Sequence, residues 1–417
     1  MALVPRRYAE LFGLPSARLI VAAGFAGRLG FGVYGLVFIL AVHEETDSFA
    51  IAGIVTAAFA LGCGAAPLCA RAIDRFGARV LLPMAVGHGI ALVALFLLLL
   101  GEAPVLPLVL CTWVAGLLMP PIGPVMRSIW RSMLPDSELL TAAISLESVA
   151  MEVVFLIGPL FVALFVAVGG LLGLLIVGPA LTLAGTAIIV AESGHHLGNE
   201  RQPGDAGGGL LGALRSREVL LLSLSMVPVG VCLGSVEVAI AAYAKGRLGP
   251  AYAGVLLATL SIGGITTGLW YGARAQQRRL RTRFMGCCFG VSALTGLLAV
   301  AQWIPTTVVL LIAFGGGFAM LLVVINQLAG TIALPGTVTE AFTWTTSSHQ
   351  TGVAVGTTVA GIAIEAGGSS AGFATASGAA AVAAMGATYL VRRARAAQEA
   401  PIPAPGDAGA SVPIERG

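Results

Sequence analysis

Apolar stretches long enough to cross a lipid bilayer dominate this chain of 417 residues. A transmembrane helix needs about 20 mostly apolar residues, and charges, glycines and prolines divide the sequence into twelve such stretches. Charged residues make up only 10% of the chain, whereas a soluble domain carries about 25%. We therefore predict an all-α membrane protein. The predicted helices cover residues 17–42, 48–70, 80–101, 104–126, 141–167, 170–191, 219–243, 251–273, 284–302, 305–331, 338–364 and 370–391.

The basic residues predict the orientation in the membrane, because cytoplasmic loops retain Lys and Arg. With the N-terminus inside, the 23 basic residues lie in cytoplasmic segments, apart from Arg28, Lys245 and Arg247. The opposite loops are acidic or neutral, as in His43–Asp47. Both termini are therefore predicted to be cytoplasmic.

The chain divides into two related halves. A polar segment from Glu192 to Arg217 separates six predicted helices from six more, and Ala70-Arg71-Ala72 recurs as Ala273-Arg274-Ala275 after the eighth helix. Such repetition is typical of transporters in which two bundles rock about a central site. The predicted parts are a cytoplasmic N-terminus (1–16), a six-helix bundle (17–191), a cytoplasmic linker (192–218), a second six-helix bundle (219–391) and a disordered cytoplasmic tail (392–417).

The loop after the second predicted helix carries the most specific motif. Residues 70–79 resemble the loop 2–3 signature of the major facilitator superfamily, Gly-x-x-x-Asp-Arg-x-Gly-Arg-Arg/Lys. Asp74, Arg75, Gly77 and Arg79 match it, whereas Ala70 and Ala78 depart from it. The resemblance implies the major facilitator fold, with twelve transmembrane helices in two pseudo-symmetric six-helix bundles.

A looser resemblance concerns the direction of transport. Gly158-Pro159 resembles part of the signature of drug/proton antiporters, and the region from Pro121 to Arg131 looks like that of bacterial efflux members. Together these features imply an exporter in the bacterial cytoplasmic (inner) membrane.

The resemblance of residues 70–79 to the loop 2–3 signature implies a gating loop. In the family this loop latches the cytoplasmic side and breaks as the bundles rock, and a carboxylate at a helix end can be held by guanidinium groups. The alternative is a topology anchor without a gating role. The gating residues implied by the motif are Arg71, Asp74, Arg75, Gly77 and Arg79.

Arg28 is the most informative single residue, because it lies near the predicted bilayer midplane. A guanidinium there should face the bundle interior and meet an anion. Glu152 enters the membrane to a similar depth in the fifth helix, which predicts an Arg28–Glu152 pair, and Glu147 lies nearer the cytoplasm. These three residues are candidates for proton coupling or substrate binding, and the alternative is an ion pair that only fixes helix packing.

Four further residues are candidates for the same site. Glu237 is either a second proton or cation site or a residue near a helix end whose side chain extends to the water. Asn326 and Trp344 offer polar contacts to substrate or to neighbouring helices. Histidine ordinarily titrates near neutral pH, which makes His349 a candidate for assisting proton coupling, although a single histidine is more often a packing residue.

Several function classes are excluded by missing motifs. The sequence has no Walker-type phosphate loop, no serine-nucleophile elbow and no zinc-type cysteine spacing. We therefore predict no enzyme activity, no catalytic residues, no metal and no cofactor, and the net charge of +3 gives no reason to expect nucleic acid.

The predicted function is proton-coupled efflux of small amphipathic molecules by alternating access. The partners are then a small-molecule substrate, protons and the lipid bilayer, with the protein acting as a monomer. One alternative is an uptake permease of the same fold for a sugar, amino acid or organic anion, whose carboxylate Arg28 would bind. A non-transporting membrane receptor or scaffold is the alternative of another class.

Overall fold

The structure is a computed structural model of the chain, and it describes residues 10–65, 68–69, 72–73, 77–134, 138–196, 215–272, 280–301, 303–332 and 338–399. Within these ranges every regular element is a helix, which confirms the predicted all-α class. The first part of the chain forms α2 (Pro15–Thr46), α3 (Phe49–Cys63), η1 (Ala78–Val80), α5 (Leu81–Leu100), α6 (Val105–Leu117), α7 (Ile122–Met133), α8 (Glu138–Ala167), η2 (Leu171–Gly173) and α9 (Leu174–His196). The second part forms α10 (Arg217–Arg247), α11 (Tyr252–Gly272), α12 (Leu280–Val300), α13 (Ile304–Ile332) and α14 (Val338–Glu399).

Two breaks modify the predicted helices for local backbone reasons. The predicted helix 104–126 is divided into α6 and α7 at Pro120 and Pro121, because proline has no N–H to continue the helical hydrogen bonds. Conversely, α14 contains both of the last two predicted helices. It breaks between them at Gly367 and Gly368, whose φ angles are −140° and 67°.

The described helices agree with the predicted number of membrane crossings. Nine segments are long and apolar enough to span a bilayer, and two shorter apolar helices, Phe49–Cys63 and Tyr252–Gly268, accompany them. One of the nine segments, Ala341–Arg392, contains the break in α14 and therefore two crossings. This set is consistent with twelve crossings in all.

Several helix ends differ from the prediction; α7, for example, continues to Met133, past the predicted end at residue 126. Helix α3 stops before Gly64, short of the predicted end at residue 70. Helix α9 continues past Glu192 to His196, and α14 continues past Arg392 to Glu399. The residues after Arg392 are mainly Ala, Arg, Gln and Glu, which favour helix strongly. The beginning of the predicted disordered tail is therefore helical, and residues 400–417 lie outside the described ranges.

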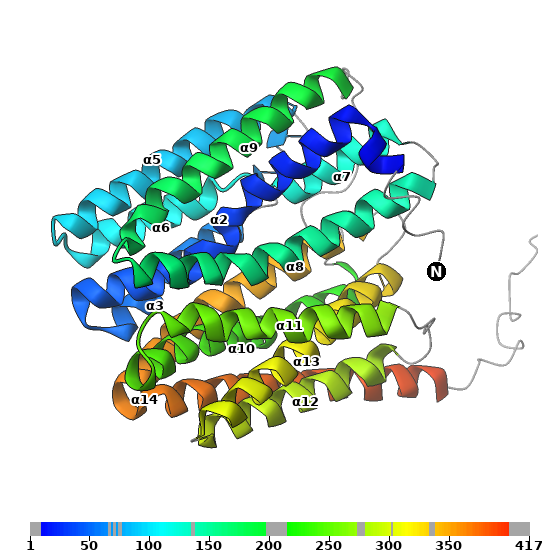
Figure 1. The fold of residues 1–417 in the computed structure, drawn as a ribbon. Helices are drawn as coiled ribbons and strands as arrows, with labels where there is room; N and C mark the ends of the chain where they lie inside the picture. Colours follow the sequence, from blue (N-terminus) through cyan, green and yellow to red (C-terminus); the bar gives the residue numbers. More distant parts are fainter. Residues whose placement is uncertain are drawn as a thin grey trace, which may run out of the picture.

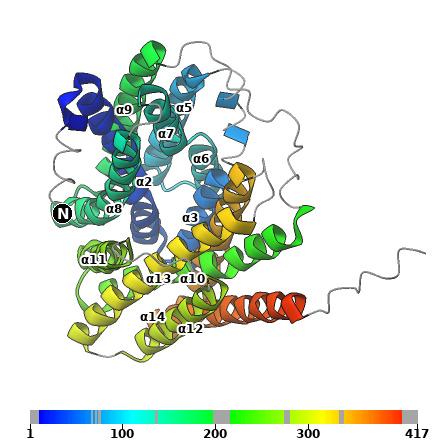
Figure 2. The same cartoon turned by 90° about the vertical axis from the view of Figure 1, so that its right-hand side faces the viewer.

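The helices form two groups that lie side by side. In both views the group from α10 to α14 lies below most of the helices that precede it (Figures 1 and 2). We call α2–α9 the N-terminal half and α10–α14 the C-terminal half. The halves meet where α3 packs on α14, α8 on α11 and α2 on α10.

The two ends of this assembly need names. The "loop end" is where α2 turns into α3 and where α14 breaks, on the left of Figure 1. The "terminal end" is where α2 begins and α14 ends, on the right of Figure 1.

The hydrophobic core shows where the halves are joined. One large cluster contains Val33–Val42 of α2 together with buried residues of α10, α11, α13 and α14, so it crosses between the halves. The terminal end of the N-terminal half has a separate cluster that includes Leu11, Ile20, Trp130 and Ile189. Among the described residues the halves therefore share a core at the loop end and the middle, while the N-terminal half has its own core at the terminal end.

Glycines bring the backbones of the two halves into contact. A Cβ added to Gly53 of α3 would overlap the carbonyl oxygen of Thr357 in α14, and one added to Gly361 of α14 would overlap that of Phe49. Membrane helices approach closely through small residues of this kind. A side chain at either position would therefore push α3 and α14 apart.

Replacing Gly361 by Leu is expected to force the loop end apart. Overpacking of this kind costs about 1–3 kcal/mol, which shifts a two-state equilibrium roughly 5- to 150-fold. Labels on the two halves at the loop end should report a longer distance in this variant. Gly290→Leu in α12 is the control, because a Cβ there meets nothing within 4 Å. If the two variants give the same distance, the Gly361 contact does not hold the halves together.

Candidate functional site

Two carboxylates face the opposite half from within their helices. Glu152 lies on α8, and a Cβ built on Gly264 of α11 would lie 3.3 Å from its Oε2 atom. Glu237 lies on α10, and a Cβ built on Gly35 of α2 would lie 3.8 Å from its Oε2 atom. Each carboxylate therefore points at a glycine of the other half, where no side chain keeps it away from the backbone.

Neither carboxylate has a charged partner in the part of the chain that the structure describes. The ion pairs found there join Arg28 to Glu147, Lys245 and His43 to Asp47, and Arg281 to Glu218. Both Glu152 and Glu237 are partly exposed rather than fully buried. Intramembrane carboxylates without a basic partner are suited to binding a proton or a cation.

The two carboxylates occupy different levels between the halves. Gly32 of α2 packs on Gly158 of α8, which sets the register of these parallel helices. Glu152 lies six residues before Gly158 in α8, and Gly35 lies three residues after Gly32 in α2. At 1.5 Å per residue, the carboxylate of Glu237 is about 13 Å nearer the loop end than Glu152. The pair thus marks a path along the interface rather than one shared site.

Arg28 binds Glu147 and not Glu152, so the predicted pair was wrong. The Nη2 atom of Arg28 donates to Oε2 of Glu147, and both side chains are buried. Side chains lean toward the N-terminus of their helix, and Arg28 Nη2 would lie 3.1 Å from a Cβ on Gly24. Gly24 lies nine residues after the start of α2, as Glu147 does in α8. The guanidinium therefore reaches the level of Glu147.

A third residue completes this pair. Nε1 of Trp130, a fully buried residue of α7, donates to Oε1 of Glu147 at 3.3 Å. Trp130 belongs to the separate core cluster at the terminal end of the N-terminal half. The three residues therefore join α2, α7 and α8 within one half, and the charge of Arg28 is already balanced. Sequence reasoning did not assign a role to Trp130, because it lay in the predicted loop between the helices 104–126 and 141–167.

The remaining candidates lie in the C-terminal half and do not converge. His349 of α14 packs its ring on Phe318 of α13, with 6.3 Å between centroids, and its Nδ1 lies 3.4 Å from Oε1 of Gln350. Trp344 packs against the buried Val219 and Ala341. Asn326 is exposed on α13. The structure therefore gives these residues separate surroundings.

The predicted gating loop is described only in part. Gly77 adopts a φ of 78°, which only glycine adopts easily, and its N–H donates to the carbonyl of Ile73 at 2.7 Å. Arg79 follows in η1 with an exposed side chain. Arg71, Asp74 and Arg75 lie outside the described residues. The positive φ of Gly77 thus explains why the motif has glycine at this position. The gating role stays a prediction.

Sequence reasoning missed one polar cluster altogether. His43, Asp47 and Ser48 of the N-terminal half contact Lys245 and Glu365 of the C-terminal half at the loop end. The signal available in the sequence was weak: charged residues lie at several loops on that side, but the chain does not show which of them meet.

The fold is shared with solved transporter structures. The nucleoside transporter NupG aligns with a TM-score of 0.72 and 11% identity, over 91% of this chain and 100% of that chain. The POT family transporter PepTSo aligns with a TM-score of 0.72 and 13% identity, over 91% and 98%. The human organic anion transporter MFSD10 (TETRAN) aligns with a TM-score of 0.65 and 14% identity, over 90% and 100%. At these identities the likeness concerns the fold.

A comparison of sequences gives the family. No curated protein sequence matches the chain. The family model described as Major Facilitator Superfamily matches residues 20–278, which is more than half of the 417 residues. Together with the all-helical fold shared with solved transporters, this match shows that the chain is a multi-pass membrane transporter that belongs to the major facilitator superfamily.

Proposed function

We propose that the protein is a proton-coupled exporter of small amphipathic molecules that works by alternating access between its two halves. The observation that carries this proposal is the pair of partly exposed carboxylates, Glu152 and Glu237, which face the interface without a basic partner among the described residues. Such groups can take up a proton on one side of the membrane and exchange it for substrate on the other.

The same geometry favours cationic or neutral substrates. Glu152 and Glu237 bring negative charge to the interface, whereas the guanidinium of Arg28 is bonded to Glu147. An organic-anion permease would need a free cation near the substrate, and the Arg28–Glu147 bond removes the candidate that the sequence offered. We therefore place proton exchange on Glu152 and Glu237, and assign to Arg28 and Glu147 the joining of α2 to α8.

The proposal also includes the orientation of the protein in the membrane, the kind of membrane and the oligomeric state. Most basic residues lie at loops of the terminal end, which by the charge rule faces the cytoplasm. The loop end then faces outward from a bacterial inner membrane. We further propose that the two bundles correspond to the N-terminal half, α2–α9, and the C-terminal half, α10–α14, and that the protein is a monomer.

Transport in proteoliposomes tests this function. The purified protein would be reconstituted with an acidic lumen and supplied outside with ethidium, an amphipathic organic cation. We expect gradient-driven uptake of ethidium that a protonophore abolishes and that empty liposomes lack. Gradient-driven movement of a fluorescent organic anion instead would support the permease alternative. A receptor or scaffold would move neither compound.

A further inference from the structure

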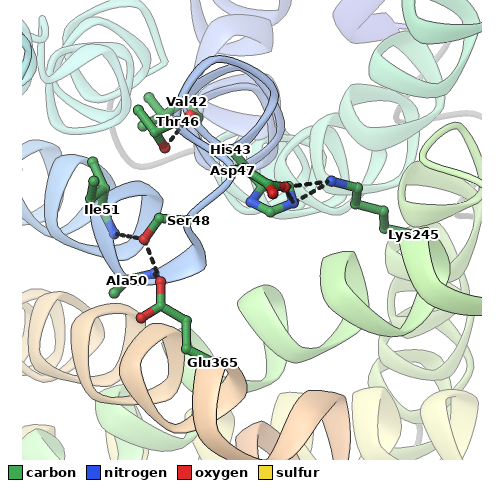
Figure 3. A network of polar contacts seen from close by, with 9 residues as sticks. All are labelled: Val42, His43, Thr46, Asp47, Ser48, Ala50, Ile51, Lys245 and Glu365. Atoms are coloured by element: carbon green, nitrogen blue, oxygen red, sulfur yellow. Dashed lines mark hydrogen bonds and ion pairs between the residues drawn. The ribbon is translucent and has the colours of Figure 1, made fainter.

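The loop end is closed by a cluster of polar residues from both halves. His43, Asp47 and Ser48 lie where α2 turns into α3, Lys245 lies near the end of α10, and Glu365 lies before the break in α14 (Figure 3). We call these five residues the loop-end cluster. It has two parts, one centred on Glu365 and one on Lys245.

Glu365 completes the cap of a helix in the other half. Ser48 is the N-cap of α3, and its Oγ accepts the N–H of Ile51 at 3.1 Å. The Ser48 hydroxyl donates to Oε1 of Glu365, and the N–H of Ala50 donates to the same oxygen at 3.1 Å. The first N–H groups of a helix lack partners and favour an anion. Glu365 supplies that anion from the C-terminal half (Figure 3).

Lys245 makes the complementary contact at the neighbouring helix end. Its Nζ atom donates to Nε2 of His43 at 2.5 Å and lies 3.6 Å from Oδ1 of Asp47. His43 lies in the last turn of α2, and Asp47 is the C-cap. The C-terminus of a helix favours a cation. The α2–α3 turn thus presents two helix ends of opposite polarity, and the C-terminal half provides the opposite charge to each.

The Lys245 contact requires a neutral histidine. An ammonium group has only donors, so Nε2 of His43 must be the acceptor. The ring is buried and stacks on Phe49, with 3.8 Å between centroids, and its Nδ1 atom has no partner among the described residues. The charged groups that act on the ring are Lys245 from α10, Asp47 from its own helix end and Glu365 from α14.

Protonation of His43 would exchange one partner for another. The protonated ring has no acceptor for Lys245 and repels its charge. Oδ1 of Asp47 lies 3.9 Å from Nε2 of His43, where it can accept a hydrogen bond from the protonated ring. Lys245 also lies 3.6 Å from this oxygen, so the protonated ring competes with Lys245 for Asp47 as well as repelling its charge. Because Lys245 belongs to the other half and Asp47 to the same half, protonation replaces contacts between the halves by one within a half.

We infer that His43 is a proton-binding site that controls closure of the loop end. Neutral His43 holds Lys245 and keeps the halves together, whereas protonated His43 turns to Asp47 and releases Lys245. This inference goes beyond the proposed exchange of protons at Glu152 and Glu237 and requires no particular substrate. With the loop end outside, acid on that side would favour opening toward it.

Distance measurements across the loop end test the inference. Spin labels would be placed at Val168 in the N-terminal half and Trp303 in the C-terminal half, which are both exposed, in a variant whose six native cysteines are replaced. Distances would be compared at about pH 8 and about pH 5, the range in which histidine changes its charge. We expect a several-fold larger population of long distances in acid. His43→Gln should remove this response, because its amide oxygen accepts from Lys245 at either pH.

Two further variants separate this site from the others. Lys245→Gln leaves His43 in place but removes the repulsion, so the pH response should again be lost. The double variant Glu152→Gln/Glu237→Gln should keep the response, which distinguishes the loop-end site from the proposed coupling carboxylates. An acid response of normal size in His43→Gln, or unchanged distances in the parent protein, would overturn the inference.

Discussion

Replacing Glu237 by Gln is expected to reduce proton-driven transport to the level of empty vesicles while the protein stays folded. The carboxylate faces Gly35 across the interface and has no partner among the described residues, so its loss breaks no ion pair. Glutamine has nearly the same shape but cannot release a proton. Glu152→Gln should have the same effect, because Glu152 faces Gly264 in the same way. Ethidium uptake under an imposed pH gradient measures both changes.

Substrate exchange without an imposed pH gradient provides the control. If Glu152 and Glu237 only carry protons, both variants should still exchange internal for external substrate down its gradient. Glu218→Gln is a matched replacement outside the interface, because Glu218 pairs with Arg281 at the beginning of α10, and its uptake should be close to that of the parent protein. Gradient-driven uptake of normal size in Glu237→Gln would remove that residue from the coupling mechanism.

Replacing Arg28 by Met is expected to destabilise the protein strongly. Arg28 and Glu147 are both buried, so the substitution leaves a buried carboxylate whose remaining partner among the described residues is the Trp130 N–H. Breaking a buried ion pair in this way costs about 3–5 kcal/mol. The effect should appear as a marked decrease of the thermal midpoint of unfolding in detergent.

Two further variants test whether the loss of the Arg28–Glu147 pair causes this decrease in stability. The double variant Arg28→Met/Glu147→Met removes both charges and should recover most of the lost stability, since a buried pair can be replaced by apolar side chains at little cost. Arg281→Met breaks a partly exposed pair with Glu218 and should change stability by about 0–1 kcal/mol. A midpoint for Arg28→Met as high as that for Arg281→Met would show that the Arg28–Glu147 pair does not hold the helices together.

The local features of the fold could be predicted from the sequence. The helices follow from apolar length, and the predicted boundary between residues 364 and 370 agrees with the break at Gly367-Gly368. The break at Pro120-Pro121 was missed, although the lack of an N–H on proline could have indicated it. The depth of Arg28, Glu152 and Glu237 follows from counting along each helix. All of these depend on neighbouring residues in the chain, which is why hydropathy and residue type were sufficient.

Contacts between distant helices could not be predicted in the same way. Depth along a helix places Arg28 near Glu152, but the lean of the side chain and the register of α2 against α8 bring it to Glu147. Likewise, Glu365 and Lys245 look like ordinary loop charges until α14 and α10 carry them to the ends of α3 and α2. The sequence by itself therefore determined the helices and the depth of their charges. Only the tertiary structure decided which charges meet, because partners on different helices depend on helix rotation and register, which local residue types do not specify.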